Sequence, residues 1–125
     1  MSAIFWFEIP VTDIDRARAF YGALLKAEIP FIDMTEQMGS KLGSLPNRVG
    51  VGGMLVENAQ HGYVPSDVGT MVYLALGDED MNDALARVEA AGGTILLPKA
   101  EMPGRGFAAW IRDLEGNKVG LHSDK

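Results

Sequence analysis

Glu8 is the first residue of the chain whose type and place could support acid–base chemistry. It lies between two apolar residues in an alternating run that is expected to form a strand. A partly buried carboxylate in such a strand needs either a partner or a function. Glu8 could act as a general base or anchor a ligand through hydrogen bonds. The alternative is a structural role, with its carboxylate bonded to Arg112, Lys118 or Tyr73.

The chain has two histidines, and each has more than one interpretation. His122 shares a predicted strand face with Lys118 and Gly120 and could act as an acid, a base or a ligand, although an exposed histidine near the end of a chain is ordinary. His61 lies in the loop sequence AQHGY, where it could form a lip over a cleft or simply be solvated. Glu8 and His122 alone would make a poor catalytic metal site, because a third ligand is missing.

Large aromatic residues accompany these polar groups. Trp6 precedes Glu8 on the same predicted strand face, and Tyr73 matches Glu8 when a later alternating run is laid over the first. Both could stack on a planar ligand, since each combines a large apolar area with one polar tip. Ordinary packing within the sheet is the alternative. Arg105 and Arg112 flank another predicted strand, and either could pair with an anionic ligand.

The elements that must position these residues occur twice in the same order. Alternation predicts strands over 4–11 and 70–76, and each is followed by a helical pattern with an acidic or hydroxyl cap. The candidate caps are Thr12 or Asp13 for the first helix and Asp78 or Asp80 for the second. The first helix is expected to end near Lys26 and the second at Gly92–Gly93.

Three further strands follow each helix. They are predicted over 30–34, 38–45 and 48–57, and over 94–97, 107–112 and 118–123. A strand, a helix and three strands, repeated, indicate an internal duplication. The prediction is therefore an α+β fold in one domain of two βαβββ modules, at about residues 1–60 and 68–125.

Composition limits the class of protein. The chain has 125 residues, 47% of them hydrophobic and 22% charged, which fits one ordinary globular domain. The absence of Cys excludes disulfides and thiolate ligands and is consistent with a reducing cytoplasm. A net charge of −6 argues against nucleic-acid or anionic-membrane partners, because both select basic patches. No signal peptide or membrane span is expected.

Three stretches together resemble the vicinal oxygen chelate superfamily, which includes glyoxalase I, bleomycin-resistance proteins and extradiol dioxygenases. They are PVTDIDRARAFYGALL, LALGDEDMNDALARVEAAGG and the terminal DLEGNKVGLH. The last is similar to the family's D-P-E-G-N-x-x-E-L segment, with Leu114 in place of Pro. The resemblance covers essentially the whole chain. It implies paired βαβββ modules that form a cup-shaped mixed sheet with helices on the outer face, and a homodimer.

The resemblance also implies positions for a divalent metal. Enzymes of the superfamily hold the metal with His and Glu from strands near the start and end of each module, and the metal acts as a Lewis acid. Here the implied positions fall on Trp6, Tyr73, Gly120 and the strand at 51–56, with Glu57 just beyond it. Met54 in that strand suits only soft metals. We therefore predict no metal, and a cleft that Gly120 widens locally.

The predicted function is that of a small cytoplasmic protein without a cofactor. It would bind a small hydrophobic or aromatic compound, as bleomycin-resistance proteins do, in a cleft lined by Trp6, Tyr73, Met54, Gly120 and Arg112. One alternative is a glyoxalase-like lyase or isomerase with Glu8 and His122 as catalytic residues. Others are a dioxygenase-like enzyme with an unusual metal site, or a degenerate subunit kept for interaction with a partner. An enzyme needs a base and a second polar group facing an open cleft, whereas a binding protein needs an aromatic cup.

Overall fold

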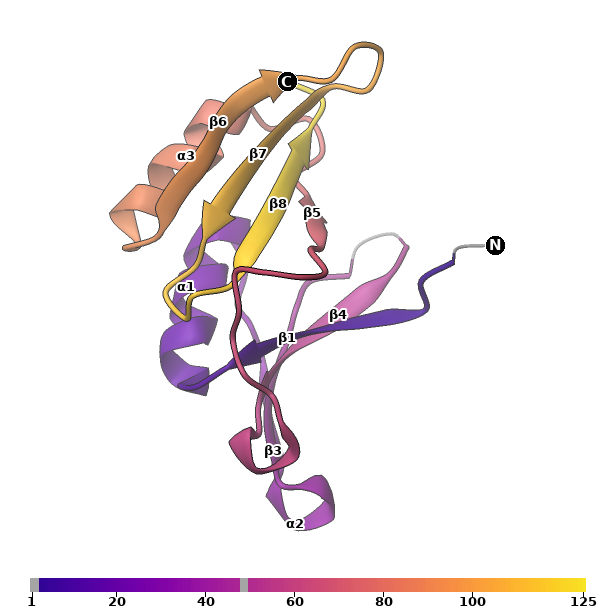
Figure 1. Ribbon diagram of the computed structural model, residues 1–125, viewed down its shortest axis with the longest axis vertical. Coiled ribbons are helices and arrows are strands. Elements are labelled where there is room, and N and C mark those ends of the chain that lie inside the picture. The colour runs from indigo at the N-terminus through magenta and orange to yellow at the C-terminus, as the bar shows by residue number, and fades with distance from the viewer. Residues whose placement is uncertain (1–2, 48–49) are drawn as a thin grey trace. The chain divides into compact units, whose positions relative to one another are not determined.

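The chain divides into two compact units, Met1–Pro65 and Ser66–Lys125. The computed structural model describes residues 3–47 and 50–125, so the start of the strand predicted over 48–57 lies outside the described residues. Each unit has its own four-stranded mixed sheet, shown in indigo to magenta for the first unit and in rose through orange to yellow for the second (Figure 1). The α+β class with two βαβββ modules is confirmed.

The first unit contains one βαβββ module with an additional helical turn. Its elements are β1 (Trp6–Val11), α1 (Ile14–Leu25), β2 (Phe31–Met34), α2 (Thr35–Met38), β3 (Ser40–Ser44), β4 (Gly52–Glu57) and the 3-10 turn η1 (Ala59–His61). The strand order is β1-β4-β3-β2, with β1 parallel to β4. The turn α2 was not predicted. It begins where the Asp33 carboxylate accepts the Thr35 N–H at 2.9 Å, which draws the chain out of the strand.

The second unit repeats the module. Its elements are β5 (Tyr73–Ala75), α3 (Met81–Ala90), β6 (Thr94–Glu101), β7 (Phe107–Arg112) and β8 (Lys118–Ser123). The strand order is β5-β8-β7-β6, with β5 parallel to β8. β6 is longer than the predicted 94–97, because register shifts opposite β7 on either side of Leu97 interrupt the alternation on which the prediction relied.

Each helix covers one face of its own sheet. α1 packs on β3 and β4, and α3 packs on β6, β7 and β8. The side chains on the helix-covered faces are buried, among them Ile9, Leu55, Leu74, Ile111 and Leu121. Because side chains alternate along a strand, the residues between them in sequence lie on the opposite face of each sheet. No helix within residues 3–47 and 50–125 is long and apolar enough to cross a membrane.

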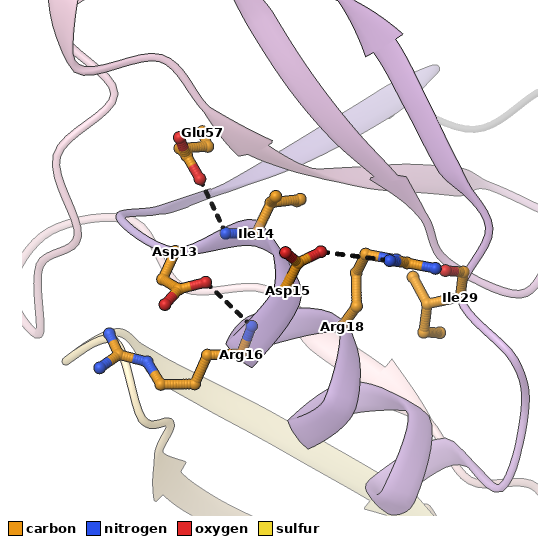
Figure 2. A network of polar contacts seen from close by, with 7 residues as sticks. All are labelled: Asp13, Ile14, Asp15, Arg16, Arg18, Ile29 and Glu57. Carbon is orange, nitrogen blue, oxygen red and sulfur yellow. Dashed lines mark hydrogen bonds and ion pairs between the residues drawn. The ribbon is translucent and has the colours of Figure 1, made fainter.

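Two carboxylates fix the start of α1 (Figure 2). Asp13 is the N-cap, as predicted, and its side chain accepts the Arg16 N–H at 3.1 Å. Glu57, the last residue of β4, accepts the Ile14 N–H at 2.8 Å. Free N–H groups at a helix start need such acceptors. Glu57 is therefore part of the fold and is not a free ligand beyond the strand.

Candidate functional site

Trp6, Glu8 and Met54 lie together on the face of the first sheet that α1 leaves uncovered. The register of β1 and β4 pairs Trp6 with Gly52 and Glu8 with Met54. The indole remains 43% exposed and lies across Gly52, where an added Cβ would come within 3.2 Å of the ring carbon Cζ3. An open hollow adjoins this ring, and its lining residues are Ile4, Phe5, Trp6, Asn47, Gly50, Val51 and Gly52.

Glu8 has a partner that the sequence did not single out. The Tyr63 hydroxyl donates to Glu8 Oε1 at 2.7 Å, so the carboxylate has a structural partner within its own unit. Tyr63 lies in the segment that follows η1. Its sequence surroundings, rich in Gly, Pro and Asn, indicated only a loop, and no signal there could have linked it to β1. The hydrogen bond holds the carboxylate beside Trp6.

The Glu8 bond should be visible in the titration of Tyr63. The hydrogen bond to Glu8 raises the pKa of Tyr63 above its ordinary value of 10.0, with partial burial and the negative charge of Glu8 adding to it. A raised folded-state pKa means that the bond stabilises fully below the unfolded pKa, near 10, and that this stability is lost as pH rises through the folded pKa. The absorbance titration of wild type minus Tyr63→Phe is expected to give a midpoint above 10.0.

The control for this titration is Glu8→Ala, which removes the acceptor and the charge together. In that background the same difference titration should move back toward the ordinary tyrosine value. If the Tyr63 midpoint is the same with and without Glu8, the pair is not bonded in solution.

Tyr73, Gly120 and Trp110 form the corresponding part of the second sheet. The register places them side by side on β5, β8 and β7. The Trp110 indole Nε1–H donates to the Tyr73 hydroxyl at 2.7 Å, and the Tyr73 ring, 48% exposed, lies directly over Gly120. A Cβ at Gly120 would be 2.5 Å from Tyr73 Cδ2. The prediction that Gly120 widens a cleft was therefore wrong, because the aromatic ring fills the space.

A ring lies over a glycine in both units. A Cβ at Gly53 would be 2.5 Å from Phe7 Cζ, and a Cβ at Gly120 would be 2.5 Å from Tyr73 Cδ2. Each pair joins the first and last strands of its module. Glycine is needed at these two positions because a neighbouring ring occupies the volume of its side chain. At Gly52 an added Cβ would instead be nearest to Asn47 Nδ2, at 3.0 Å, with the Trp6 ring at 3.2 Å.

His122 lies two residues beyond Gly120 on the same face of β8. Its cross-strand neighbours are Ala75 and Ala108, so small side chains flank the half-buried imidazole. His122 Nε2 is 2.5 Å from the Arg105 carbonyl oxygen. A carbonyl can only accept, so Nε2 carries a proton and donates.

Two cations of the second unit, Arg112 and Lys118, have different partners. Arg112 Nη2 lies 3.2 Å from Asp67 Oδ2, so this guanidinium already has a carboxylate. Lys118, opposite Arg112 in the register, places its ammonium 5.4 Å from the centroid of the Trp110 ring. Arg112 was predicted to bind a ligand, whereas Lys118 was predicted to share a strand face with Gly120 and His122 or to pair with Glu8.

His61 has a local structural partner. Its Nδ1 is 3.1 Å from Asn58 Oδ1. Asn58 is buried and donates to the Met38 carbonyl and the Ser40 hydroxyl, each at 2.9 Å. His61 is thus bonded to a residue that ties the segment after β4 to the start of β3, which favours the ordinary interpretation over a lip.

Comparison with known proteins identifies the family. The sequence model of the Glyoxalase/Bleomycin resistance protein/Dioxygenase superfamily matches residues 3–121. The chain belongs to this superfamily. The resemblance seen in the sequence is confirmed, since the match spans both units.

Solved structures of this superfamily share the fold. A glyoxalase/bleomycin resistance protein from Albidiferax ferrireducens T118 has a TM-score of 0.75 at 19% identity, covering 98% of each chain. TnmS3, an antibiotic binding protein from Streptomyces sp. CB03234, has a TM-score of 0.65 at 21% identity, covering 100% of this chain and 98% of its own. The fosfomycin resistance protein FosX from Listeria monocytogenes has a TM-score of 0.67 at 15% identity, covering 100% of this chain and 93% of its own. No curated protein sequence matches significantly.

The residues of this superfamily member do not fit the divalent metal that the resemblance implies. The implied ligand positions carry Trp6, Tyr73 and Gly120, and the carboxylate nearest the fourth position, Glu57, is bonded to the start of α1. In the part of the chain that the structure describes, no group of three or more His, Asp or Glu side chains could hold an ion. Indole and glycine supply no ligand atom from their side chains.

The structure thus brings together part of each predicted site. Trp6, Glu8 and Met54 share one face in the first unit, and Tyr73, Gly120, His122 and Arg112 share one in the second. Tyr63 and Trp110 were missed. The sequence did hold a signal that Trp110 belongs to this face. Every second residue of a strand lies on the same face, so Trp110 must share one with Ala108 and Arg112.

Proposed function

We propose that this protein binds planar aromatic small molecules on the aromatic faces of its sheets, without the divalent metal of its superfamily. The observation that carries the proposal is the bonded pair of Tyr73 and Trp110 over Gly120. The pair presents half-exposed aromatic area whose orientation is fixed by a hydrogen bond. Fixed aromatic side chains of this kind stack well on flat ligands, because little conformational freedom is lost on binding.

The comparisons support the binding of a small molecule. One similar structure is an antibiotic binding protein and others are glyoxalase/bleomycin resistance proteins. Binding without catalysis needs only a shaped aromatic surface, which Trp6 and Tyr73 supply, whereas metal chemistry needs ligands that the implied positions lack. The net charge of −6 and the absence of Cys support a cytoplasmic protein with no nucleic-acid partner. Superfamily membership supports a homodimer.

The second candidate is a metal-independent lyase or isomerase with Glu8 as its base. The observation in favour is the Tyr63 bond, which orients an exposed carboxylate beside Trp6. A positioned carboxylate can abstract a proton if a substrate stacks on the neighbouring indole. Glu8→Gln would then abolish turnover and leave binding intact, whereas a pure binding protein shows no turnover to lose.

The test uses the two tryptophans of the chain, one on each aromatic face. Metal-free protein is titrated with planar aromatic compounds of two and three fused rings, and the two indole N–H signals are followed by NMR. We expect saturable shifts in the presence of a chelator and about tenfold weaker binding in Tyr73→Leu, as the loss of one aromatic contact implies. Phe31→Leu, which removes an exposed ring from β2, is the matched control and should bind normally.

Two results would contradict the proposal. One is the absence of saturable shifts at either indole with every compound. The other is binding that requires added zinc, nickel, manganese or iron(II), because the metal site would then exist in spite of the residues at the implied positions.

A further inference from the structure

We infer that the aromatic face of the second unit selects planar aromatic anions, compounds whose ring carries a carboxylate or another negatively charged oxygen. This inference rests on the proposed function and adds the charge of the ligand to it. The surface concerned consists of Tyr73, Trp110 and Lys118, on β5, β7 and β8, with Gly120 beneath the Tyr73 ring.

The Tyr73 hydroxyl is left as a donor. Its oxygen accepts the Trp110 indole N–H at 2.7 Å, so the hydroxyl hydrogen must point away from the indole. Within residues 3–47 and 50–125, no group accepts that hydrogen. The indole is itself only a donor. Tyr73 therefore offers one O–H directed away from Trp110, at the edge of the stacking surface.

Lys118 supplies a cation beside the same surface. Its ammonium lies over the Trp110 ring, 5.4 Å from the centroid, and no carboxylate of the described residues lies within ion-pair distance of it. The neighbouring cation, Arg112, is paired with Asp67 at 3.2 Å. Lys118 is thus the charge that a ligand can engage without breaking an existing ion pair.

A planar anion satisfies both donors at once. Its ring stacks on Trp110 and Tyr73, and its oxygen accepts from the Tyr73 O–H and the Lys118 ammonium, as charge-assisted hydrogen bonds favour. A cationic ring would be repelled by the Lys118 ammonium, and a neutral ring would gain only the stacking contribution. The preference should therefore follow the sign of the ligand's charge, although the protein as a whole carries −6 and would repel anions at long range.

The experiment compares three probes of nearly equal size: 2-naphthoate, 2-naphthamide and 2-naphthylmethylammonium. Binding to the full chain in the Trp6→Phe background is followed through the remaining indole N–H signal, that of Trp110. We expect 2-naphthoate to bind about fivefold more tightly than the amide, the size of effect that one exposed charge pair supplies, and the ammonium probe to bind weakest.

Two lysine variants assign the preference. Lys118→Met should bring the affinities for 2-naphthoate and 2-naphthamide to within about twofold of each other, and Lys118→Arg should retain the preference. Lys99→Met is the charge-matched control. Lys99 also belongs to the second unit and lies 4.4 Å from the Phe107 ring centroid, but its ammonium is paired with Asp80 at 3.6 Å, so the preference should persist.

The outcomes separate this inference from the proposed function. Equal binding of all three probes, tighter binding of the ammonium probe, or a preference that survives Lys118→Met would overturn the inference and leave the proposed function intact. If none of the probes shifts the indole signals of wild type or of the Trp6→Phe variant, the proposed function fails and the inference fails with it.

Discussion

Gly120→Ala is expected to lower the free energy of unfolding by about 2 kcal/mol, as overpacking of a well-filled site does, and to remove binding of planar aromatic ligands. The added Cβ would lie 2.5 Å from the Tyr73 ring, so the ring must leave its place. Its hydrogen bond with the Trp110 indole would then be lost. Urea denaturation gives the stability, and the Trp110 indole N–H signal in NMR gives the fate of the bond.

The control for Gly120→Ala is the same substitution in a Tyr73→Ala background. Once the ring is absent, the new methyl group has nothing to displace, and alanine is the better strand residue. We expect Gly120→Ala to lower the free energy of unfolding by about 1 kcal/mol less in this background than in wild type. Directly contacting pairs show interaction energies of about 0.5–3 kcal/mol. An equal cost in both backgrounds would show that the clash is not with Tyr73.

Gly106→Ala is expected to lower the free energy of unfolding more than Gly120→Ala does, by about 3 kcal/mol, because backbone strain and a steric clash add. Gly106 has φ +79°, which costs an ordinary residue about 1–2 kcal/mol, and its Cβ would run into the Ser123 carbonyl oxygen, which adds about 1–3 kcal/mol. A backbone oxygen on β8 cannot move aside as a side chain can. Urea denaturation measures the loss, and the imidazole signals of His122 report whether its bond to Arg105 survives.

Gly104→Ala separates the two penalties. Gly104 lies in the same turn with φ +75°, but a Cβ there would meet no atom within 4 Å. It should therefore cost only the backbone strain, about 1–2 kcal/mol, and leave His122 unchanged. If the two substitutions cost the same, the contact between Gly106 and Ser123 contributes nothing.

The fold was largely predictable because its signals are local. Alternation gave β7 and β8 with their observed limits, and the acidic residues Asp13 and Asp80 cap α1 and α3 as expected. The turn α2 and the full length of β6 were missed. In both places a side-chain contact or a register shift overrides the periodicity, and neither can be read from the order of residues alone.

The site was predictable only where a strand face could be assigned from parity. Trp6 with Glu8, and Gly120 with Lys118 and His122, were grouped in this way. Tyr63 was not, because a loop residue has no periodicity that aims it at a strand. The meaning of Gly120 was also misjudged, since the absence of a side chain in the sequence does not tell whether the space is empty or is filled by a neighbouring ring.

The parallel pairing of first and last strands has a consequence for synthesis of the chain. In each unit the strand made first lies beside the strand made last, β1 with β4 and β5 with β8. A nascent unit therefore holds its first strand without a partner while its helix and the other strands emerge. Closing such a long-range contact is slow, and it leaves apolar surface exposed meanwhile. We expect each unit to fold only after its fourth strand has left the ribosome, and chaperones to engage the chain in that interval.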